Sequence, residues 1–196
     1  MKLTFQPPQK AKHKNKMLYT RKGDDGTSSL YKSKDRITKN HPVFEALGGL
    51  DELNSLLGVC FAKYQCEKPV LFNVCKIIRT IQHNLFIIQA GLAGAEKSIP
   101  KSRIEEMEYI IGEIESYIEK PNSFVIAGAT ELSALFDYAR ALSRRTERSV
   151  ISANLRLDKQ LSPETLSYLN RLSSLLYALA RYEAFLSHKK EEVPVY

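Results

Sequence analysis

The sequence lacks the apolar runs and leader patterns that mark membrane-spanning or exported chains. A helix that crosses a bilayer needs about 20 mostly apolar residues, whereas the closest run, LFIIQAGLAGA at 85–95, is short and contains Gln89. The first residues hold no apolar stretch of a secretory signal, and they are few and poor in arginine for a mitochondrial presequence. We therefore predict no membrane partner and a cytoplasmic location. The mitochondrial matrix is the alternative if the basic start acts as a weak presequence.

Cysteine and histidine are too scattered for familiar metal or nucleophile sites. Cys60, Cys66 and Cys75 are odd in number and form no Cys-x-x-Cys pair, which argues against a disulfide framework or a zinc site and fits a reducing compartment. The histidines form neither a His-x-x-x-His nor a Glu-x-x-His pair, so a di-iron bundle is disfavoured and no metal ligand is assigned. No serine or cysteine nucleophile motif is present. If the chain is an enzyme, a bound reactant supplies the nucleophile.

What is present is an ordinary globular composition with a basic excess. The 196 residues suffice for one domain with one sizeable core, and 43% of them are hydrophobic. The formal net charge is +7, and much of it lies before residue 23, where seven lysines and arginines meet no acidic residue. Such a charge favours phosphate-rich partners. We predict a basic tail over 1–17 and a single helical domain over 18–190.

Apolar periodicity predicts five helices. Apolar positions three and four residues apart recur over 43–64, 69–95, 101–119, 130–152 and 163–188. The seams are Leu50, Leu53, Leu57 and Cys60; Val74, Ile78, Ile81, Leu85, Ile88 and Leu92; Ile104, Met107, Ile111, Ile114 and Ile118; Leu132, Leu135, Ala139 and Leu142; and Leu169, Leu172, Leu176 and Leu179. No period-2 strand array or internal repeat accompanies them. The predicted fold class is all-α, a ferritin-like up-and-down bundle of five helices.

The stretch YTRKGDDGTSSLY, residues 19–31, joins two glycines to hydroxyl and basic side chains. Glycines let backbone amides approach a ligand, and hydroxyl and guanidinium groups add donors, as a row of phosphates requires. The pattern is not a Walker A loop, because Gly23 and Gly26 are too close together and no Gly-Lys-Ser/Thr follows. Taken alone, this glycine loop is also compatible with an ordinary polar turn.

A second candidate site lies in the fourth predicted helix. The stretch ARALSRRTERSV places Arg140, Arg144 and Arg148 four residues apart, with Arg145 and Glu147 among them. A charged helix face is often simply solvated. Four guanidiniums in nine residues nevertheless repel one another unless an anion or a carboxylate lies between them, and an oligophosphate suits their fork geometry.

Two polar positions interrupt the apolar faces of other helices. Asp51, within EALGGLDELNSLLG, is either an exposed residue or the partner of an arginine on another helix or subunit. Asn170, within YLNRLS, is either a solvated amide or a hydrogen-bonding group for a ligand at a helix interface.

Four stretches, taken together and in this order, resemble the PduO-type ATP:cob(I)alamin adenosyltransferases. They are YTRKGDDGTSSL, KNHPVFEALGGLDELNSLLG, FVIAGATELSALFDYARALSRRTERSV and YLNRLSSLLYALAR, and the resemblance runs from about Tyr19 to Phe185. It implies a five-helix bundle assembled as a homotrimer with active sites between subunits. It also implies transfer of the 5′-deoxyadenosyl group of ATP to the cobalt of cob(I)alamin, with release of triphosphate and with Mg²⁺ as cofactor. The reduced corrinoid would then be the missing nucleophile.

The resemblance assigns roles to individual residues. Phe124 matches the aromatic that displaces the lower axial ligand of the corrinoid, and Arg144 matches a catalytic arginine. Arg140 matches the arginine that forms an intersubunit salt bridge with the aspartate of the DELN motif, here Asp51. The residues implied to bind ATP are Thr20, Arg21, Gly23, Ser28, Ser29, Lys39, Arg144, Arg145, Glu147, Arg148 and Asn170.

Several positions depart from the family pattern. Asp25 stands where family members often have a lysine near phosphate, so it either weakens ATP binding or serves Mg²⁺. The turn over 32–35 is one residue longer than usual, which affects the alignment of Lys39. The turn after Phe124 reads Ala-Gly-Ala at 127–129 instead of a proline-glycine-glycine type, which affects the corrinoid loop.

Three functions remain open from the sequence. An adenosyltransferase needs a cob(II)alamin reductase as a partner and can serve an adenosylcobalamin-dependent enzyme. A non-catalytic carrier or sensor would bind ATP and cobalamin but form no product. A nucleic-acid surface is the third interpretation, but no stacking-aromatic pattern or known motif supports it, so no nucleic-acid partner is predicted.

Overall fold

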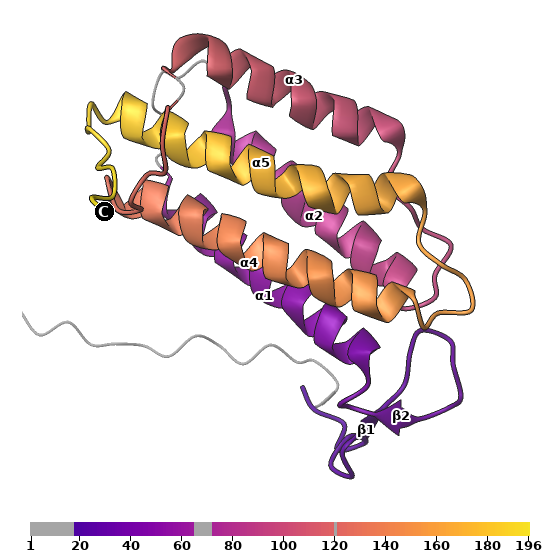
Figure 1. Cartoon of the computed structure of the whole chain (residues 1–196). Coiled ribbons are helices and arrows are strands. Elements are labelled where there is room, and N and C mark those ends of the chain that lie inside the picture. Colours follow the sequence, from indigo (N-terminus) through magenta and orange to yellow (C-terminus); the bar gives the residue numbers. More distant parts are fainter. Residues whose placement is uncertain (1–17, 65–71, 120) are drawn as a thin grey trace, which may run out of the picture.

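The computed structural model describes residues 18–64, 72–119 and 121–196, and its main elements are five helices (Figure 1). The predicted tail 1–17 and the start of the second expected helix, 69–71, lie outside the described residues. The helices are α1 Pro42–Lys63, α2 Val74–Leu92, α3 Lys101–Tyr117, α4 Glu131–Asn154 and α5 Pro163–Leu186. The prediction of an all-α, five-helix fold is confirmed. Within the described ranges, no helix is long and apolar enough to cross a bilayer.

Side chains at the helix starts satisfy backbone amides that have no partner within the helix. Ser162 Oγ accepts the amide of Thr165 at the start of α5. Thr130 and Ser133 form a reciprocal capping box at the start of α4. The beginning of α4 is therefore fixed immediately after the segment that carries Phe124.

The predicted apolar seams meet in one core. Every seam residue of α1, α2 and α5 is at most 1% exposed. In α3, by contrast, only Met107 and Ile114 of the five seam positions are buried, because α3 is an outer helix that packs on α5 (Figure 1). Helix α4 packs against both α1 and α5, so the arginines on its surface are held in place from two sides.

The close approach of α1 to α4 explains one of the two adjacent glycines in α1. The hydroxyl of Thr146 donates a 3.1 Å hydrogen bond to the carbonyl of Gly49. A Cβ on Gly49 would lie 3.2 Å from that hydroxyl oxygen, so a larger residue would push the two helices apart. Gly48 has open space instead. The contact sets the arginine face of α4 at the level of the polar positions of α1.

A short antiparallel pair of strands, β1 Thr27–Ser28 and β2 Ile37–Thr38, closes the glycine loop into a hairpin. The periodicity of the sequence gave no sign of it, because two residues are too few to show alternation. The amide of Lys39 continues the pairing with a 2.9 Å bond to the carbonyl of Gly26. The loop is thus a folded element at the start of α1.

One expectation about the cysteines is wrong. Cys75 is disulfide-bonded, whereas Cys60 is a free and fully buried thiol. The absence of a Cys-x-x-Cys pair therefore did not exclude a disulfide, because cysteines at other spacings can also approach closely enough to form one.

Candidate functional site

Lys39 folds back over the glycine loop. Its Nζ donates a 2.8 Å hydrogen bond to the carbonyl of Gly23. A Cβ on Gly23 would lie 3.0 Å from the same nitrogen and 3.3 Å from the carbonyl oxygen of Thr27, so only glycine fits without displacing the lysine. The structure thus brings Lys39 to the loop despite the longer turn at 32–35. Its ammonium group lies beside backbone that an anion could approach.

Arg36 organises the same loop, and the sequence analysis did not single it out. Its guanidinium donates to the carbonyl of Lys22, to the carbonyl of Thr27 at 3.0 Å and to the Thr27 hydroxyl at 2.7 Å. It also lies 3.5 Å from a carboxylate oxygen of Asp25. One planar side chain therefore joins both limbs of the hairpin. The available signal was a lone arginine among lysines near the end of the loop.

Asp25, the main departure in this loop, is used internally. Its carboxylate accepts the hydroxyl of Thr27 at 2.8 Å and the amide of Thr27 at 3.0 Å. These two hydrogen bonds, followed by the nearby charge of Arg36, hold the pKa of Asp25 below its usual value. The carboxylate is thus ionised and neutralised inside the loop.

The rest of the glycine loop exposes donors in an open backbone. Gly26 has φ +77°, and Arg21 has φ +60°, a conformation uncommon for a residue with a side chain. The side chains of Thr20, Arg21 and Ser29 are exposed, and Ser28 is partly buried in β1. The amide of Tyr31 bonds the carbonyl of Ala93 at 3.2 Å, which fixes the hairpin against the end of α2.

The arginine face of α4 is solvent-exposed and only partly neutralised. Arg145 forms a 2.7 Å ion pair with Glu52 of α1, and the side chain of Glu147 is half-buried. Within the part of the chain that the structure describes, neither Arg144 nor Arg148 has a carboxylate at ion-pairing distance. These two guanidiniums are available to an external anion.

The structure does not bring Asp51 and Arg140 together within one chain. Asp51 is exposed on α1, whereas the Nε of Arg140 lies 3.4 Å from Asp137 on its own helix. The in-chain pair between these two helices is formed by Glu52, the neighbour of Asp51, with Arg145. Within the described residues, Asp51 therefore has no ion-pair partner.

Asn170 lies at the surface of α5, away from the core. Its carbonyl accepts the hydroxyl of Ser173 at 3.1 Å, and the adjacent Arg171 pairs with Glu108 of α3 at 3.0 Å. The side chain of Asn170 faces outward, so a ligand would have to reach it from outside this chain's core.

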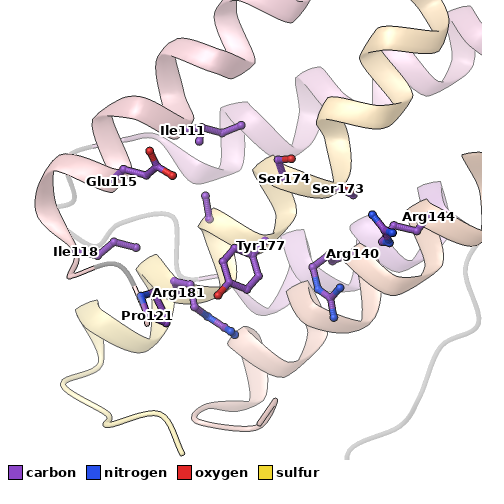
Figure 2. Close-up of a pocket in the computed structure, with 11 residues that line it drawn as sticks. Ile111, Glu115, Ile118, Pro121, Arg140, Arg144, Ser173, Ser174, Tyr177 and Arg181 are labelled. Carbon is purple, nitrogen blue, oxygen red and sulfur yellow. The ribbon is translucent and has the colours of Figure 1, made fainter. Parts of the chain in front are cut away.

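A cavity of about 360 Å³ opens between α3, α4 and α5. Figure 2 shows Arg140 and Arg144 on α4 at one side, with Ser174, Tyr177 and Arg181 of α5 between them and α3. The opposite wall is formed by Ile111, Glu115 and Ile118 of α3 and by Pro121. The cavity joins an apolar wall to a basic one.

Phe124 lies at one end of the bundle and is 81% exposed. A second cavity, of about 510 Å³, is lined by residues 121–125 and by charged side chains of α4 and α5. Among these, Arg181 and Asp137 are buried and form an ion pair. The sequence analysis missed them, although a charged residue within the apolar run LYALARYEAF was a visible signal.

The sequence-predicted site residues fall at different levels of the bundle (Figure 1). The glycine loop lies beside the end of α4, and Phe124 precedes its start. Because α4 has 24 residues and an α-helix rises about 1.5 Å per residue, roughly 36 Å of helix separates these ends. One chain therefore does not place its glycine loop beside its own Phe124.

Known proteins match nearly the whole described chain. The family model for cobalamin adenosyltransferase matches residues 18–183. The corrinoid adenosyltransferase PduO of Salmonella typhimurium is 36% identical over 179 residues, which are 88% of this chain and 51% of that protein. A corrinoid adenosyltransferase of Citrobacter freundii is 36% identical over 168 residues, 85% of this chain and 94% of that protein. The chain thus spans about half the length of the PduO relatives.

Solved structures agree with the sequence comparison. A variant PduO-type ATP:corrinoid adenosyltransferase from Lactobacillus reuteri, complexed with cobalamin and ATP, matches with a TM-score of 0.81 and 26% identity over 91% of this chain and 96% of that one. Another variant from the same organism, complexed with ATP, matches with a TM-score of 0.80 and 26% identity over 91% of this chain and 100% of that one.

Proposed function

Because the chain belongs to the cobalamin adenosyltransferase family, we propose that it transfers the 5′-deoxyadenosyl group of ATP to the cobalt of a reduced corrinoid. Triphosphate is the leaving group. The observation that carries the proposal is the pair of guanidiniums, Arg144 and Arg148, that have no carboxylate partner within the described residues. Positive charge held on a fixed helix without an internal counter-ion is what an oligophosphate requires.

The triphosphate end of ATP would lie between the glycine loop and the arginine face. The glycine loop offers Arg21, Ser28, Ser29 and the ammonium group of Lys39. Arg144 opposes the negative charge that develops on the leaving triphosphate, and such preorganised charge lowers the barrier because it needs no rearrangement during the reaction. Asn170 would hydrogen-bond the nucleotide from α5.

Mg²⁺ would be carried mainly by the nucleotide. This ion keeps several waters and takes most other ligands from phosphates, with one or two carboxylates from the protein. In the described residues no group of three or more His, Cys, Asp or Glu side chains could hold an ion, which fits that arrangement. Since Asp25 is engaged by Thr27 and Arg36, Glu147 and the exposed Asp24 are the carboxylates that remain near the proposed ATP site.

Phe124 would act on the corrinoid. An exposed aromatic side chain at the rim of a 510 Å³ cavity can press against the lower face of the ring and displace the axial ligand. Removal of that donor favours the electron-rich cob(I) state. The cobalt electron pair would then form the bond to C5′ while the C5′–oxygen bond breaks, and triphosphate would leave with the electron pair of that broken bond.

We further propose that the active sites lie between subunits of a homotrimer. The glycine loop and Phe124 of one chain lie at opposite ends of α4, so a site that needs both must take them from two chains. Asp51 and Arg140 form no ion pair with each other within the chain, and an intersubunit salt bridge would pair them. A heterologous interface of this kind closes into a ring.

Outside partners follow from the chemistry. Cob(II)alamin must gain one electron before it can react, so a reductase must supply it, and an adenosylcobalamin-dependent enzyme would consume the product. A cytoplasmic location remains a prediction. The alternative function is a carrier or sensor that binds ATP and cobalamin without turnover.

The test is anaerobic incubation of the purified protein with chemically reduced cobalamin, ATP and Mg²⁺. The loss of cob(I)alamin absorbance and the release of triphosphate are followed together. We expect light-sensitive adenosylcobalamin in equal amount to triphosphate. Arg144→Ala should lower the rate about 100- to 1,000-fold, the usual cost of removing one preorganised charge-stabilising donor.

Arg103→Ala is the matched control, since Arg103 is an exposed arginine of the outer helix α3 and outside the proposed site. It should leave the rate unchanged. Phe124→Ala should lower turnover more than ATP binding, and equal losses in both would refute the role of Phe124. Binding of both substrates without any product would replace the enzyme with the carrier or sensor.

A further inference from the structure

The C-terminal segment crosses the loop that carries Phe124. After α5 ends, His188 adopts φ +51° and the amide of Lys189 bonds the carbonyl of Ala184 at 3.0 Å, which turns the chain back. The amide of Ile126 then donates a 2.8 Å hydrogen bond to the carbonyl of Glu192, in an antiparallel bridge. Two residues beyond Phe124, the loop is therefore joined to the end of the chain.

An ion pair between the buried Arg181 and the partly buried Glu191 fixes this crossing to the bundle. The Nε of Arg181 lies 2.8 Å from an oxygen of Glu191, and the side chain of Arg181 is only 3% exposed. The same guanidinium contacts Asp137 of α4 and lies over the ring of Tyr177, 4.8 Å from its centre. Arg181 thus joins α4, α5 and the C-terminal segment at one point.

The loop has little else to hold it. Among the described residues, the bond from Ile126 to Glu192 is the one backbone hydrogen bond that links 121–129 to another segment. Cavities of about 510 and 380 Å³ border the loop, and both include Arg181 in their lining. Phe124 itself is exposed, so burial of its ring does not fix the loop.

We propose that residues 189–193 form a C-terminal clasp that positions the Phe124 loop, with Glu191 as the positioning residue. Glu191 does not touch the reactants. It docks the clasp on Arg181, which aligns the carbonyl of Glu192 with the amide of Ile126 and sets the distance of Phe124 from the lower face of the corrinoid. The catalytic consequence rests on the proposed adenosyltransferase function.

Charge reversal at one or the other of two adjacent residues distinguishes the loss of the clasp from a general effect of the changed net charge. Glu191→Lys places an ammonium group against the Arg181 guanidinium, and the clasp should detach. Glu192→Lys makes the same change in net charge on an exposed side chain and keeps the backbone carbonyl that Ile126 uses. Glu191→Ala is the milder variant, because Arg181 keeps its partner Asp137.

The first measurement is hydrogen–deuterium exchange of the Ile126 amide in the full-length variants. We expect at least tenfold faster exchange in Glu191→Lys and Glu191→Ala, and exchange within twofold of the original protein in Glu192→Lys. Unchanged exchange in both Glu191 variants would overturn the clasp. This measurement needs neither ATP nor corrinoid, so it stands apart from the proposed activity.

The second measurement is the rate of adenosylcobalamin formation. Glu191→Lys should lower kcat about tenfold, while the KM for ATP stays within twofold of the value for the unaltered protein. It should also reduce the spectroscopic signal of four-coordinate cob(II)alamin, the form that has lost its lower axial ligand. A parallel loss in KM, or an unchanged kcat despite faster exchange, would overturn the positioning role. If the unaltered protein forms no adenosylcobalamin while Ile126 exchange responds as expected, the proposed function falls and the structural clasp is retained.

Discussion

The two ends of the bundle hold their predicted site residues in different ways. At the glycine-loop end, Asp25, Thr27 and Arg36 contact one another and Lys39 contacts Gly23, all within a stretch of 17 residues. At the Phe124 end, Ile126 is joined to Glu192, and Arg181 to Asp137 and Glu191, so that the residues in contact are up to 66 positions apart in the sequence. The first end is a local motif, and the second is assembled by the tertiary fold.

This difference has an energetic consequence. The ion pairs of the glycine loop are exposed to solvent, where such pairs contribute about 0–1 kcal/mol to stability. The Arg181 pairs are buried, where removal of one partner leaves an uncompensated charge. Damage to the loop should therefore weaken binding while the fold survives, whereas damage at the Phe124 end should also destabilise the fold.

The largest expected effect is that of Arg181→Ala. Its loss leaves the buried Asp137 and the partly buried Glu191 without their cation, so the free energy of unfolding should fall by about 3–5 kcal/mol. Chemical denaturation measures it. Arg171→Ala is the control, since Arg171 pairs with Glu108 at the surface, and it should cost at most about 1 kcal/mol. If both variants lose the same free energy of unfolding, the Phe124 end is not stabilised by its buried charges and the proposed difference between the two ends is wrong.

Arg36→Ala should have the next largest effect, on ATP binding. It removes the guanidinium that joins Lys22 to Thr27, so the two limbs of the hairpin lose the link that holds the proposed phosphate-binding loop in shape. The Kd for ATP, measured by calorimetry, should rise at least tenfold with little change in Tm. Lys34→Ala, an exposed change in the same hairpin, should alter neither. A large drop in Tm for Arg36→Ala would mean that this end also supports the fold.

Gly23→Ala should weaken ATP binding more modestly. The added Cβ would lie 3.0 Å from Nζ of Lys39, and a flexible lysine can move aside, so we expect a Kd several-fold higher, about 1 kcal/mol. Gly48→Ala is the matched control, because its Cβ would meet nothing within 4 Å. Its Kd should be unchanged, and its stability slightly higher from the better helix propensity of alanine.

The smallest expected effect concerns Cys60, which lies about one turn before Lys63 on α1. The Nζ of Lys63 lies 2.6 Å from a carboxylate oxygen of Glu131 at the start of α4, so Cys60 belongs to the Phe124 end. Burial raises the pKa of the Cys60 thiol to about 11, so the thiol keeps its proton until strongly alkaline pH. At pH 8 only about one molecule in a thousand carries the reactive thiolate.

Alkylation of Cys60 by iodoacetamide, followed by peptide mass spectrometry, should therefore be slow at pH 8. The rate of alkylation should rise as the pH approaches 11. At pH 8 the rate should stay slow in Arg36→Ala and increase slightly in Arg181→Ala. Fast labelling of the unaltered protein at pH 8 would mean that the thiol is not held in the core. Equal labelling of the two variants would mean that the ends loosen together.

The sequence was sufficient for the parts of the molecule that follow local rules. Apolar periodicity predicted the helices, and the motif around Gly23 predicted the loop, because both depend on residues a few positions apart. It could not show that Arg36 joins the hairpin limbs or that Arg181 meets Glu191, since these contacts depend on packing. Nor could it anticipate the disulfide of Cys75. The buried seam of α3 was overestimated because periodicity does not tell an outer helix from a central one.

The central claim is that one active site combines the glycine loop of one subunit with Phe124 of another. It is tested most directly by mixing two variants, Lys39→Ala and Phe124→Ala, in trimers formed by co-expression, and by assaying adenosylcobalamin formation. In randomly mixed trimers, about a quarter of the sites would receive both intact residues, so activity should recover to about a quarter of that of the unaltered protein. If the mixed trimers are no more active than the average of the two variants alone, the site lies within one subunit and the account is wrong.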